Sequence, residues 1–194
     1  MPGSAMRTRL LDVAQELVQT RGYNAFSFHD LARRVRLRAP SIHHHFPSKA
    51  DLGRELMARY RVGFGSRLSE IESRTRDARA RLKRFVGLFT ETFRAGDRLC
   101  LCGMLATEYA TLPRPVRIEV NGFYRDAEAW LTRVFSAGRE AGRLAFAGSP
   151  AGAARAFFSG LEGALIAARA FQDEKRLTSA GNWLIKALGQ GRIG

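Results

Sequence analysis

Apolar residues recur along the chain at intervals of three and four positions, the spacing of one face of an α-helix. The first such stretch is Arg7–Arg21, and Gly22 follows where a helix would end. The remaining stretches with this spacing are Phe28–Val35, Ala39–His45, Ser48–Ser73, Ala78–Arg94, Leu99–Tyr109, Val116–Gly138, Pro150–Phe171 and Thr178–Leu188. No segment alternates apolar and polar residues for long enough to form a β-strand. The pattern predicts an all-α protein of about nine helices.

The first third of the chain has clear signals for the start of helices. Ser27 and Asp30 have the spacing of a capping box, and Ser48 and Asp51 repeat it at the start of the longest predicted helix. Between these two signals, residues 36–38 separate two short helices. Two short helices joined by a tight turn and followed by a longer helix describe a helix-turn-helix unit, whose second helix enters the major groove of DNA.

Length and composition limit the class of protein. The 194 residues are 45% hydrophobic and 26% charged, which is too apolar for a disordered chain and sufficient for one or two domains. No apolar run reaches the roughly 18 residues of a membrane span, and the N-terminus lacks the apolar core of a signal peptide. The only two cysteines, Cys100 and Cys102, are too close for a disulfide framework. We therefore expect a cytoplasmic protein with no membrane partner.

The charge of the chain indicates a polyanionic partner. Lys and Arg number 32 against 18 Asp and Glu, giving a net charge of +14. A protein this basic is typical of binding to nucleic acid or to an anionic membrane surface. Positive charge is spread along the whole sequence, so charge alone does not locate the binding face.

The helix-turn-helix segment also carries a family motif. It reads Ser-Phe-His-Asp-Leu-Ala from position 27 and Pro-Ser-Ile-His-His-His-Phe-Pro-Ser-Lys-Ala-Asp-Leu from position 40. This run resembles the tetracycline-repressor (TetR/AcrR) family of bacterial transcription regulators, whose motif is approximately Thr-x-x-Asp-Ile-Ala followed by Leu-Tyr-x-His-Phe-x-Ser-Lys-x-x-Leu. The resemblance spans residues 7–55. It implies a DNA-binding domain at 1–50 and a helical ligand-binding and dimerisation domain at 51–194.

Three positions depart from the family motif. Arg36 stands in the turn where the family usually has Gly, and it needs a backbone conformation that tolerates a β-carbon. Arg38 stands where the family usually has Ser, and His43 where it usually has Tyr. Because both Arg38 and His43 keep hydrogen-bond donors facing the groove, these two changes indicate an unusual operator, with DNA binding retained.

Physical chemistry and the resemblance together predict the DNA contacts. Ser27 and Lys49 lie at helix N-termini, which favour a phosphate. Arg38 can form a bidentate pair with guanine, with Ser41 and His43 as further base readers. The expected DNA-binding residues are Ser27, His29, Arg38, Ala39, Pro40, Ser41, His43, His44, His45 and Lys49.

A metal site is the competing interpretation of the histidine run at residues 43–45. Consecutive residues of a helix point about 100° apart, so three in a row do not converge on one ion. No Cys, Asp or Glu stands at ligand spacing from these histidines. We therefore expect no metal. Arg33 and Arg34 on the preceding helix are expected to form a solvated charged face.

The long C-terminal part of the chain exceeds what DNA binding requires, and the resemblance implies that it senses a ligand and dimerises. It is rich in large aromatic residues, most of which belong to the core. The expected ligand contacts are Phe64, Phe89, Met104, Glu108, Phe123 and Trp130. Small residues at three- and four-residue spacing in Ala153–Phe171, together with Trp183, Leu184 and Leu188, predict the homodimer interface. In the family the last two helices of each subunit form a four-helix bundle.

Cys100 and Cys102 leave two interpretations open. Cys100 lies near Arg98 at the predicted start of a helix, a setting that lowers the pKa of a sensor thiol. Some family members that respond to electrophiles and oxidants have a cysteine and a glutamate at a spacing similar to that of Cys100 and Glu108. The alternative is a buried, inert cysteine that acts as a small hydrophobe.

The sequence contains no arrangement typical of an enzyme. No Ser/His/Asp order, Gly-rich phosphate loop or paired carboxylates at catalytic spacing is present, so we expect no catalytic residues and no cofactor. The predicted function is a ligand-responsive repressor released from a palindromic DNA operator by a small-molecule inducer or electrophile. The alternatives are a helical enzyme or small-molecule binding protein that merely contains a helix-turn-helix, and a basic protein acting at a membrane surface.

Overall fold

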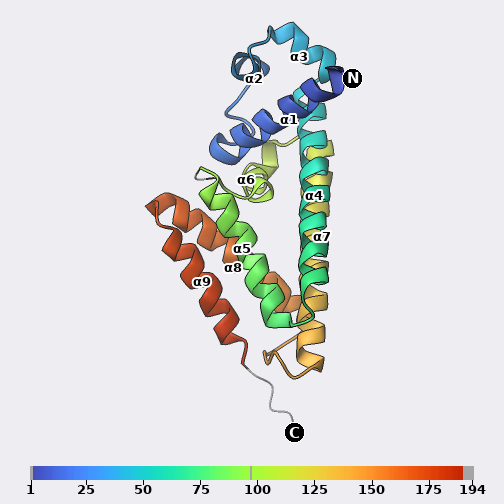
Figure 1. The fold of residues 1–194 in the computed structure, drawn as a ribbon. Coiled ribbons are helices and arrows are strands. Elements are labelled where there is room, and N and C mark those ends of the chain that lie inside the picture. Colours follow the sequence, from blue (N-terminus) through green and yellow to red (C-terminus); the bar gives the residue numbers. More distant parts are fainter. Residues whose placement is uncertain (1, 97, 190–194) are drawn as a thin grey trace. The chain divides into compact units, whose positions relative to one another are not determined.

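The computed structural model describes residues 2–96 and 98–189, and of residues 2–4 and Ala39 it describes the backbone alone (Figure 1). These residues form nine α-helices and a short 3-10 helix, which confirms the predicted all-α fold. In chain order they are α1 (Pro2–Arg21), α2 (Phe28–Val35), α3 (Ala39–His45), α4 (Lys49–Arg74), α5 (Ala78–Arg94), α6 (Leu101–Thr107), η1 (Tyr109–Thr111), α7 (Arg114–Glu140), α8 (Pro150–Phe171) and α9 (Glu174–Ala187).

Helices α2, α3, α5 and α8 have the predicted bounds, and the other helices differ at their ends. Helix α9 begins earlier than predicted because the Asp173 side chain caps it by accepting from the Lys175 N–H at 2.9 Å. Helix α7 begins at Arg114, with Pro115 in the first turn, where the missing N–H costs no hydrogen bond. The predicted Leu99–Tyr109 helix is instead the shorter α6 followed by η1.

The chain packs as two compact units. The N-terminal unit runs through Val62 and includes Leu101–Phe123, and the C-terminal unit comprises Gly63–Cys100 and the chain from Tyr124 onward. The predicted division at residue 50 follows the DNA-binding motif, whereas these units follow packing. Helices α4 and α7 therefore each contribute residues to both units.

The core of the N-terminal unit holds the helix-turn-helix together. The apolar stripe predicted on α1 is buried, with Leu10 and Val18 fully so. Ile42 of α3 and Phe46, which caps the end of that helix, are also fully buried. The largest fully buried side chains of this unit are Leu10, Leu17, Leu31, Ile42, Phe46, Leu52, Leu56 and Met57. Burial of this set fixes which face of α3 remains outside.

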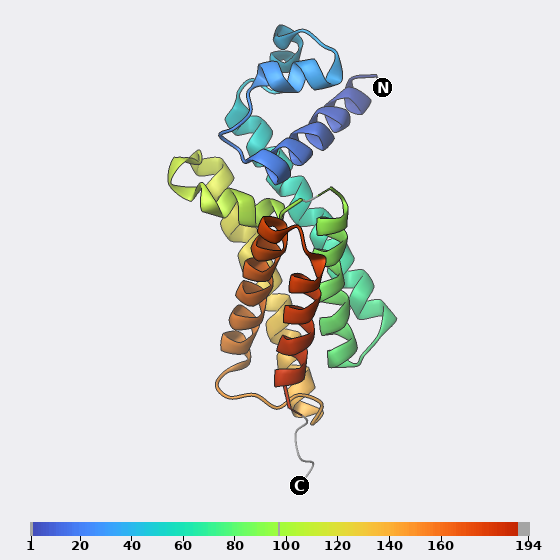
Figure 2. The same cartoon turned by 90° about the vertical axis from the view of Figure 1, so that its left-hand side faces the viewer.

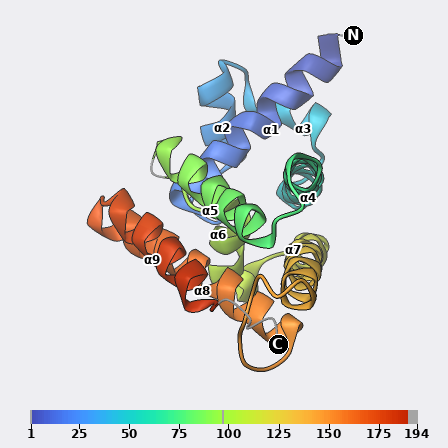
Figure 3. The ribbon, with the colours of Figure 1, turned by 60° about the horizontal axis from the view of Figure 1, so that its bottom comes forward.

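The C-terminal unit is built on three mutually packed helices, α5, α8 and α9. Helices α8 and α9 run antiparallel side by side (Figure 2), and the view from below shows α5 beside them (Figure 3). Phe85 of α5 lies at the centre of the aromatic core. Its ring centroid lies 5.6–6.3 Å from those of Phe64, Phe89, Trp130, Phe157 and Phe158.

Candidate DNA interface and ligand-sensing interior

The turn between α2 and α3 is built around Arg36. Its backbone lies in the left-handed region, at φ 59° and ψ 43°. The N–H of Leu37 donates to the Ala32 carbonyl oxygen at 2.9 Å and closes the end of α2. A β-carbon is crowded in this conformation, so glycine is favoured there. The departure from the family motif at Arg36 therefore has a structural cost.

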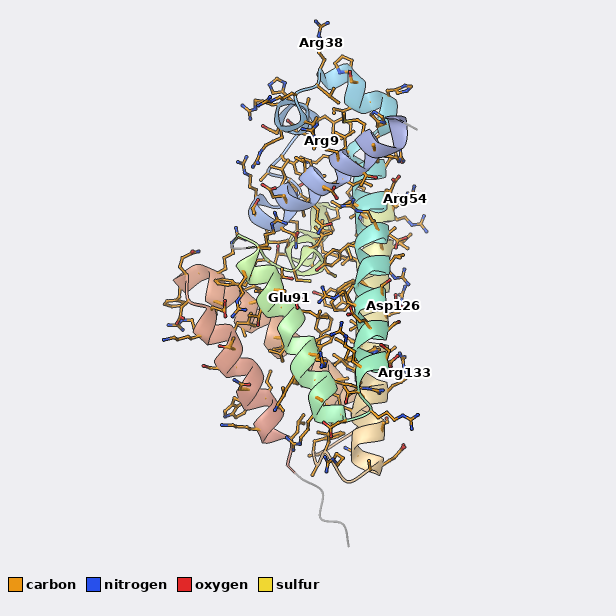
Figure 4. All side chains as sticks on the ribbon, viewed as in Figure 1. Arg9, Arg38, Arg54, Glu91, Asp126 and Arg133 are labelled. Carbon is orange, nitrogen blue, oxygen red and sulfur yellow. The ribbon has the colours of Figure 1, made fainter. Side chains whose placement is uncertain are left out.

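Arg38 begins α3 and is available to a partner molecule. It is the N-cap residue in extended conformation, and its side chain makes no capping hydrogen bond. The side chain is exposed and extends away from the neighbouring helices of its unit (Figure 4). Among the described residues it forms no ion pair, so its five N–H donors face solvent.

The predicted DNA contacts lie on one unit, along the start of α2, the turn, α3 and the start of α4. Of these residues, His45 and Lys49 are half-buried, and the side chain of Ala39 lies outside the described part. The exposed ones are Ser27, His29, Arg38, Pro40, Ser41, His43 and His44. The predicted capping box is present at Ser27, where the Ser27 N–H donates to Asp30 at 2.9 Å and the Asp30 N–H donates to Ser27 Oγ at 3.3 Å. At Ser48 the Asp51 N–H donates to Ser48 Oγ at 3.1 Å, and the Asp51 carboxylate accepts from the Ser48 hydroxyl.

His43 is exposed but held in place. Its ring packs edge-on against Phe28, with 4.9 Å between the ring centroids. Its Nδ1 lies 3.3 Å from the Pro47 carbonyl oxygen, a hydrogen bond when that nitrogen is protonated. These contacts restrict the rotamers of His43 on α3, which reduces the entropy lost when a partner binds.

The ammonium of Lys49 is engaged within the chain. Its Nζ donates to the Phe26 carbonyl oxygen and lies 4.6 Å and 4.5 Å from the ring centroids of Tyr23 and Phe26. The Tyr23 hydroxyl donates to the Lys49 carbonyl oxygen at 2.9 Å. Burial lowers the pKa of Lys49. A phosphate contact by Lys49 would have to use the ammonium N–H groups that do not donate to Phe26.

Arg7 is an organising residue that the sequence did not single out. It donates to the His45 carbonyl oxygen, and its Nε donates to Glu55 Oε1 at 2.8 Å. Its guanidinium also lies 4.4 Å from the centroid of the Phe46 ring. The partners are 38 and 48 residues away in sequence, so no local pattern reveals them. Arg7 ties α1 to the end of α3 and to α4.

Arg33 and Arg34 form exposed ion pairs on α2. Arg33 pairs with Asp30 at 2.8 Å, and Arg34 pairs with Glu16 of α1 at 3.1 Å. Exposed pairs of this kind contribute little to stability because water screens them. Both side chains are exposed and charged, as a solvated face requires.

The carboxylate of Glu108, an expected ligand contact, is occupied by backbone donors. Its Oε2 accepts from the Tyr23 N–H at 2.6 Å, and its Oε1 accepts from the Asn24 N–H at 3.2 Å. Gly22 makes room for this contact, since a β-carbon there would lie 2.9 Å from Oε1. Glu108 therefore fastens the loop after α1. A ligand would have to compete with these hydrogen bonds.

The remaining expected ligand contacts are divided between the two units. Met104 and Phe123 lie in the N-terminal unit, where the Phe123 ring is buried 5.5 Å from that of Tyr60. Phe64, Phe89 and Trp130 lie in the aromatic core of the C-terminal unit. The indole Nε1 of Trp130 is buried without a hydrogen-bond partner among the described residues.

Both cysteines are buried. The Cys102 thiol donates to the Val120 carbonyl oxygen at 3.7 Å, within the N-terminal unit. Cys100 belongs to the C-terminal unit, where its thiol hydrogen-bonds the carboxyl group of Glu162. Burial raises the pKa of Glu162 to about 7, and the bond from Cys100 opposes part of that rise. Glu162 stands among the small residues of α8, and no residue-type pattern in the sequence marks it as a functional position.

The surface of α8 and α9 exposes large apolar side chains. Trp183 is 67% exposed, Phe171 is 63% exposed and Ile166 is 46% exposed. The predicted small-residue stripe is divided: Gly160 packs within the unit, since a β-carbon there would lie 3.1 Å from Leu184 Cδ1, whereas Gly163 faces open space. An apolar surface of this kind typically marks a protein–protein contact.

Neither a membrane span nor a metal cluster is found in the described part of the chain. No helix there is long and apolar enough to cross a membrane. No three His, Cys, Asp or Glu side chains within residues 2–96 and 98–189 lie close enough together to hold a metal ion.

An exposed recognition helix on a helix-turn-helix, followed by a helical C-terminal part, defines a class of DNA-binding proteins. The family profile described as "Bacterial regulatory proteins, tetR family" matches residues 10–56, and "Tetracyclin repressor-like, C-terminal domain" matches residues 68–184. The chain therefore belongs to the TetR family of bacterial regulatory proteins, as the motif indicated. The family consists of transcriptional regulators, so the protein is a DNA-binding regulator and the enzyme alternative is excluded.

Individual relatives agree with this assignment. The structure of a TetR-family transcriptional regulator from Agrobacterium tumefaciens is 31% identical, with a TM-score of 0.93 over 96% of this chain and 98% of that chain. Transcriptional regulator AcuR of Cereibacter sphaeroides is 27% identical over 82% of this chain and 74% of its own length. The HTH-type transcriptional repressor NemR of Escherichia coli is 24% identical over 90% of this chain and 89% of its own.

Proposed function

We propose that the protein is a repressor that binds a palindromic operator and leaves it when a small molecule or electrophile reaches the C-terminal part of the chain. The observation that carries the proposal is the exposed Arg38 at the start of α3, which forms no ion pair with any described residue, in a chain whose residues 68–184 match a repressor-like C-terminal domain. AcuR and NemR are named as a transcriptional regulator and a repressor, which supports the same function here.

The proposed DNA contacts are those predicted from the sequence. Arg38, Ser41 and His43 read base edges, with Arg38 paired to a guanine. Ser27, His44, His45 and Lys49 contact the phosphate backbone. Residues His29, Ala39 and Pro40 complete the set as base contacts. The exposure of α3 and the fixed ring of His43 support this proposal.

The proposed assembly is a homodimer through α8 and α9. The exposed apolar side chains of these helices support it, and Gly163 allows close approach of a second copy. A two-fold axis is functionally required, because two recognition helices must lie about 34 Å apart to read two half-sites.

We propose that the inducer binds in the interior of the C-terminal part. The alternative is that modification of the Cys100 thiol releases the operator. The aromatic cluster around Phe85 supports an apolar ligand. Burial of Cys100 supports the inert role, while its hydrogen bond to Glu162 offers a proton acceptor for thiol chemistry. In either case inducer and operator weaken each other's binding by the same factor.

A gel-shift titration against the promoter region adjoining the protein's own gene tests this function. We expect a specific shift that weakens as salt concentration rises. Arg38→Ala should lower affinity for the operator by about 1–3 kcal/mol and leave binding to random DNA nearly unchanged. Equal loss on both DNAs would show that Arg38 contacts only the backbone. The absence of any specific shift would contradict the repressor.

A further inference from the structure

The C-terminal unit contains a buried carboxyl group, that of Glu162 on α8. Oxygen Oε1 of Glu162 is buried and has no hydrogen-bond partner among the described residues. The Cys100 thiol is the one neighbouring group in this part of the chain that bonds the carboxyl. Buried polar groups are nearly always satisfied by protein, water or ligand, so an orphaned oxygen at this depth needs an explanation.

No cationic side chain of the described residues partners Glu162. The sequence contains 32 Lys and Arg, yet none forms an ion pair with Glu162 within the described residues. Burial without a counterion disfavours the charged form of a carboxylate, so such a group usually takes up a proton. The elevated pKa of Glu162 reflects this situation. A cation that also donates an N–H would satisfy both the charge and the orphaned oxygen.

Glu162 shares a face of α8 with an aromatic residue. Phe158 lies four residues earlier on α8, so the two side chains share one face of the helix. The Phe158 ring centroid lies 5.4 Å from that of Tyr124, 6.0 Å from that of Phe85 and 6.1 Å from that of Phe89. Aromatic faces attract cations and bury apolar bodies. Trp130 stacks on Phe85 and belongs to the same cluster, and its indole N–H has no hydrogen-bond partner within the described part of the chain.

We propose that Glu162 is the anchor of a binding subsite for a protonated primary or secondary amine attached to an apolar or aromatic body. The ammonium donates an N–H to Oε1 of Glu162, and the body of the ligand packs on the rings beside Phe158. The inducer of the proposed repressor belongs to this chemical class, and in that respect the inference rests on the proposed function.

Calorimetric titration of the full-length protein with 2-phenylethylamine and with 2-phenylethanol tests the subsite. The two probes match in size and differ in the charged N–H donor. We expect the amine to bind at least about tenfold more tightly than the alcohol, a difference of about 1.4 kcal/mol. Glu162→Gln should raise the Kd of the amine by about tenfold or more, and should leave the Kd of the alcohol nearly unchanged.

Two controls complete the experiment. Glu140→Gln removes an exposed carboxylate of the same unit and should bind the amine as tightly as the wild type. N,N,N-trimethyl-2-phenylethylammonium keeps the charge without an N–H and should bind more weakly than the primary amine. Circular dichroism of both glutamine variants confirms that they fold.

Three results would overturn the subsite: equal affinity for amine and alcohol, undiminished amine binding by Glu162→Gln, or no binding of any probe. In each case Glu162 would be a hydrated carboxyl group. None of these results contradicts the repressor proposal, which the gel-shift titration tests separately. Amine binding that depends on Glu162, without operator binding, would keep the subsite and reject the repressor.

Discussion

Arg36 lowers the stability of the helix-turn-helix, because it has a left-handed backbone conformation that favours glycine. We expect Arg36→Gly to raise the free energy of unfolding by about 1 kcal/mol, since the crowding of the β-carbon outweighs the extra entropy of glycine. Denaturant titration measures the change. Arg36→Ala is the matched control, because it removes the guanidinium and keeps the β-carbon. Equal stabilisation by both variants would attribute the effect to charge.

Glu162 should make stability depend on pH. Burial raises its pKa from the ordinary 4.5 to about 7, so folding favours the protonated form. The stabilising contribution is fully present below the unfolded pKa and is lost as pH rises through about 7. We therefore expect the Tm of the wild type to fall between pH 5 and pH 8 relative to that of Glu162→Gln. Glu140→Gln, in which an exposed carboxylate is removed, should keep the wild-type profile.

Calorimetric Tm values between pH 5 and pH 8 test whether burial raises the pKa of Glu162 in the folded protein. If the Tm profiles of wild type and Glu162→Gln run parallel, the carboxyl of Glu162 ionises in the folded protein as it does in water, and the burial argument is wrong.

At the scale of residues, the sequence predicted local features and missed long-range ones. The capping contacts of Ser27 and Ser48 and the exposed start of α3 follow from neighbours a few positions apart, and they were predictable. The contacts of Lys49 with two rings, of Glu108 with a distant loop and of Arg7 with α3 depend on tertiary packing. No residue-type pattern marks Glu162, because its character comes from burial alone.

Among the helices, the contact of α9 with α5 depends on Gly181. A β-carbon at this position would lie 2.5 Å from Cγ1 of Val86, so the helices would have to separate. We expect Gly181→Ala to lower the free energy of unfolding by about 1–3 kcal/mol, the usual cost of overpacking. A β-carbon at Gly87 of α5 would face open space. Gly87→Ala should therefore raise the free energy of unfolding by about 1 kcal/mol, because alanine has the higher helix propensity. Denaturant unfolding compares the two variants, and stabilisation by both would contradict the close contact.

The order and number of helices were predictable because each one has its own apolar spacing and punctuation. Helix α8, for instance, begins where Ser149 caps Gly152 N–H at 3.0 Å and Pro150 follows. Helix bounds were predicted wrongly where the apolar spacing is weak. The start of α9 is an example, because Asp173 caps a first turn that is charged and has no apolar residue to mark it. The grouping of Leu101–Phe123 with the N-terminal unit could not be predicted, since packing between distant helices leaves no periodic trace.

At the scale of the whole molecule, the dimer should depend on the exposed face of α8. Gly163→Leu places a large side chain in open space on the folded chain, so the fold should persist while a second copy is kept away. We expect sedimentation to show a shift from dimer to monomer. Gly63→Leu on α4, also in open space, is the matched control and should remain dimeric. A stable dimer of Gly163→Leu would place the interface elsewhere.

The central claim is that a two-fold dimer reads DNA with two copies of α3. The most direct measurement is the affinity of the wild-type protein for its operator before and after about five base pairs are inserted between the half-sites, which turns them to opposite faces of the duplex. We predict that affinity falls to the level of random DNA at the same salt concentration. Undiminished affinity for the spaced operator would contradict binding by a rigid pair of recognition helices.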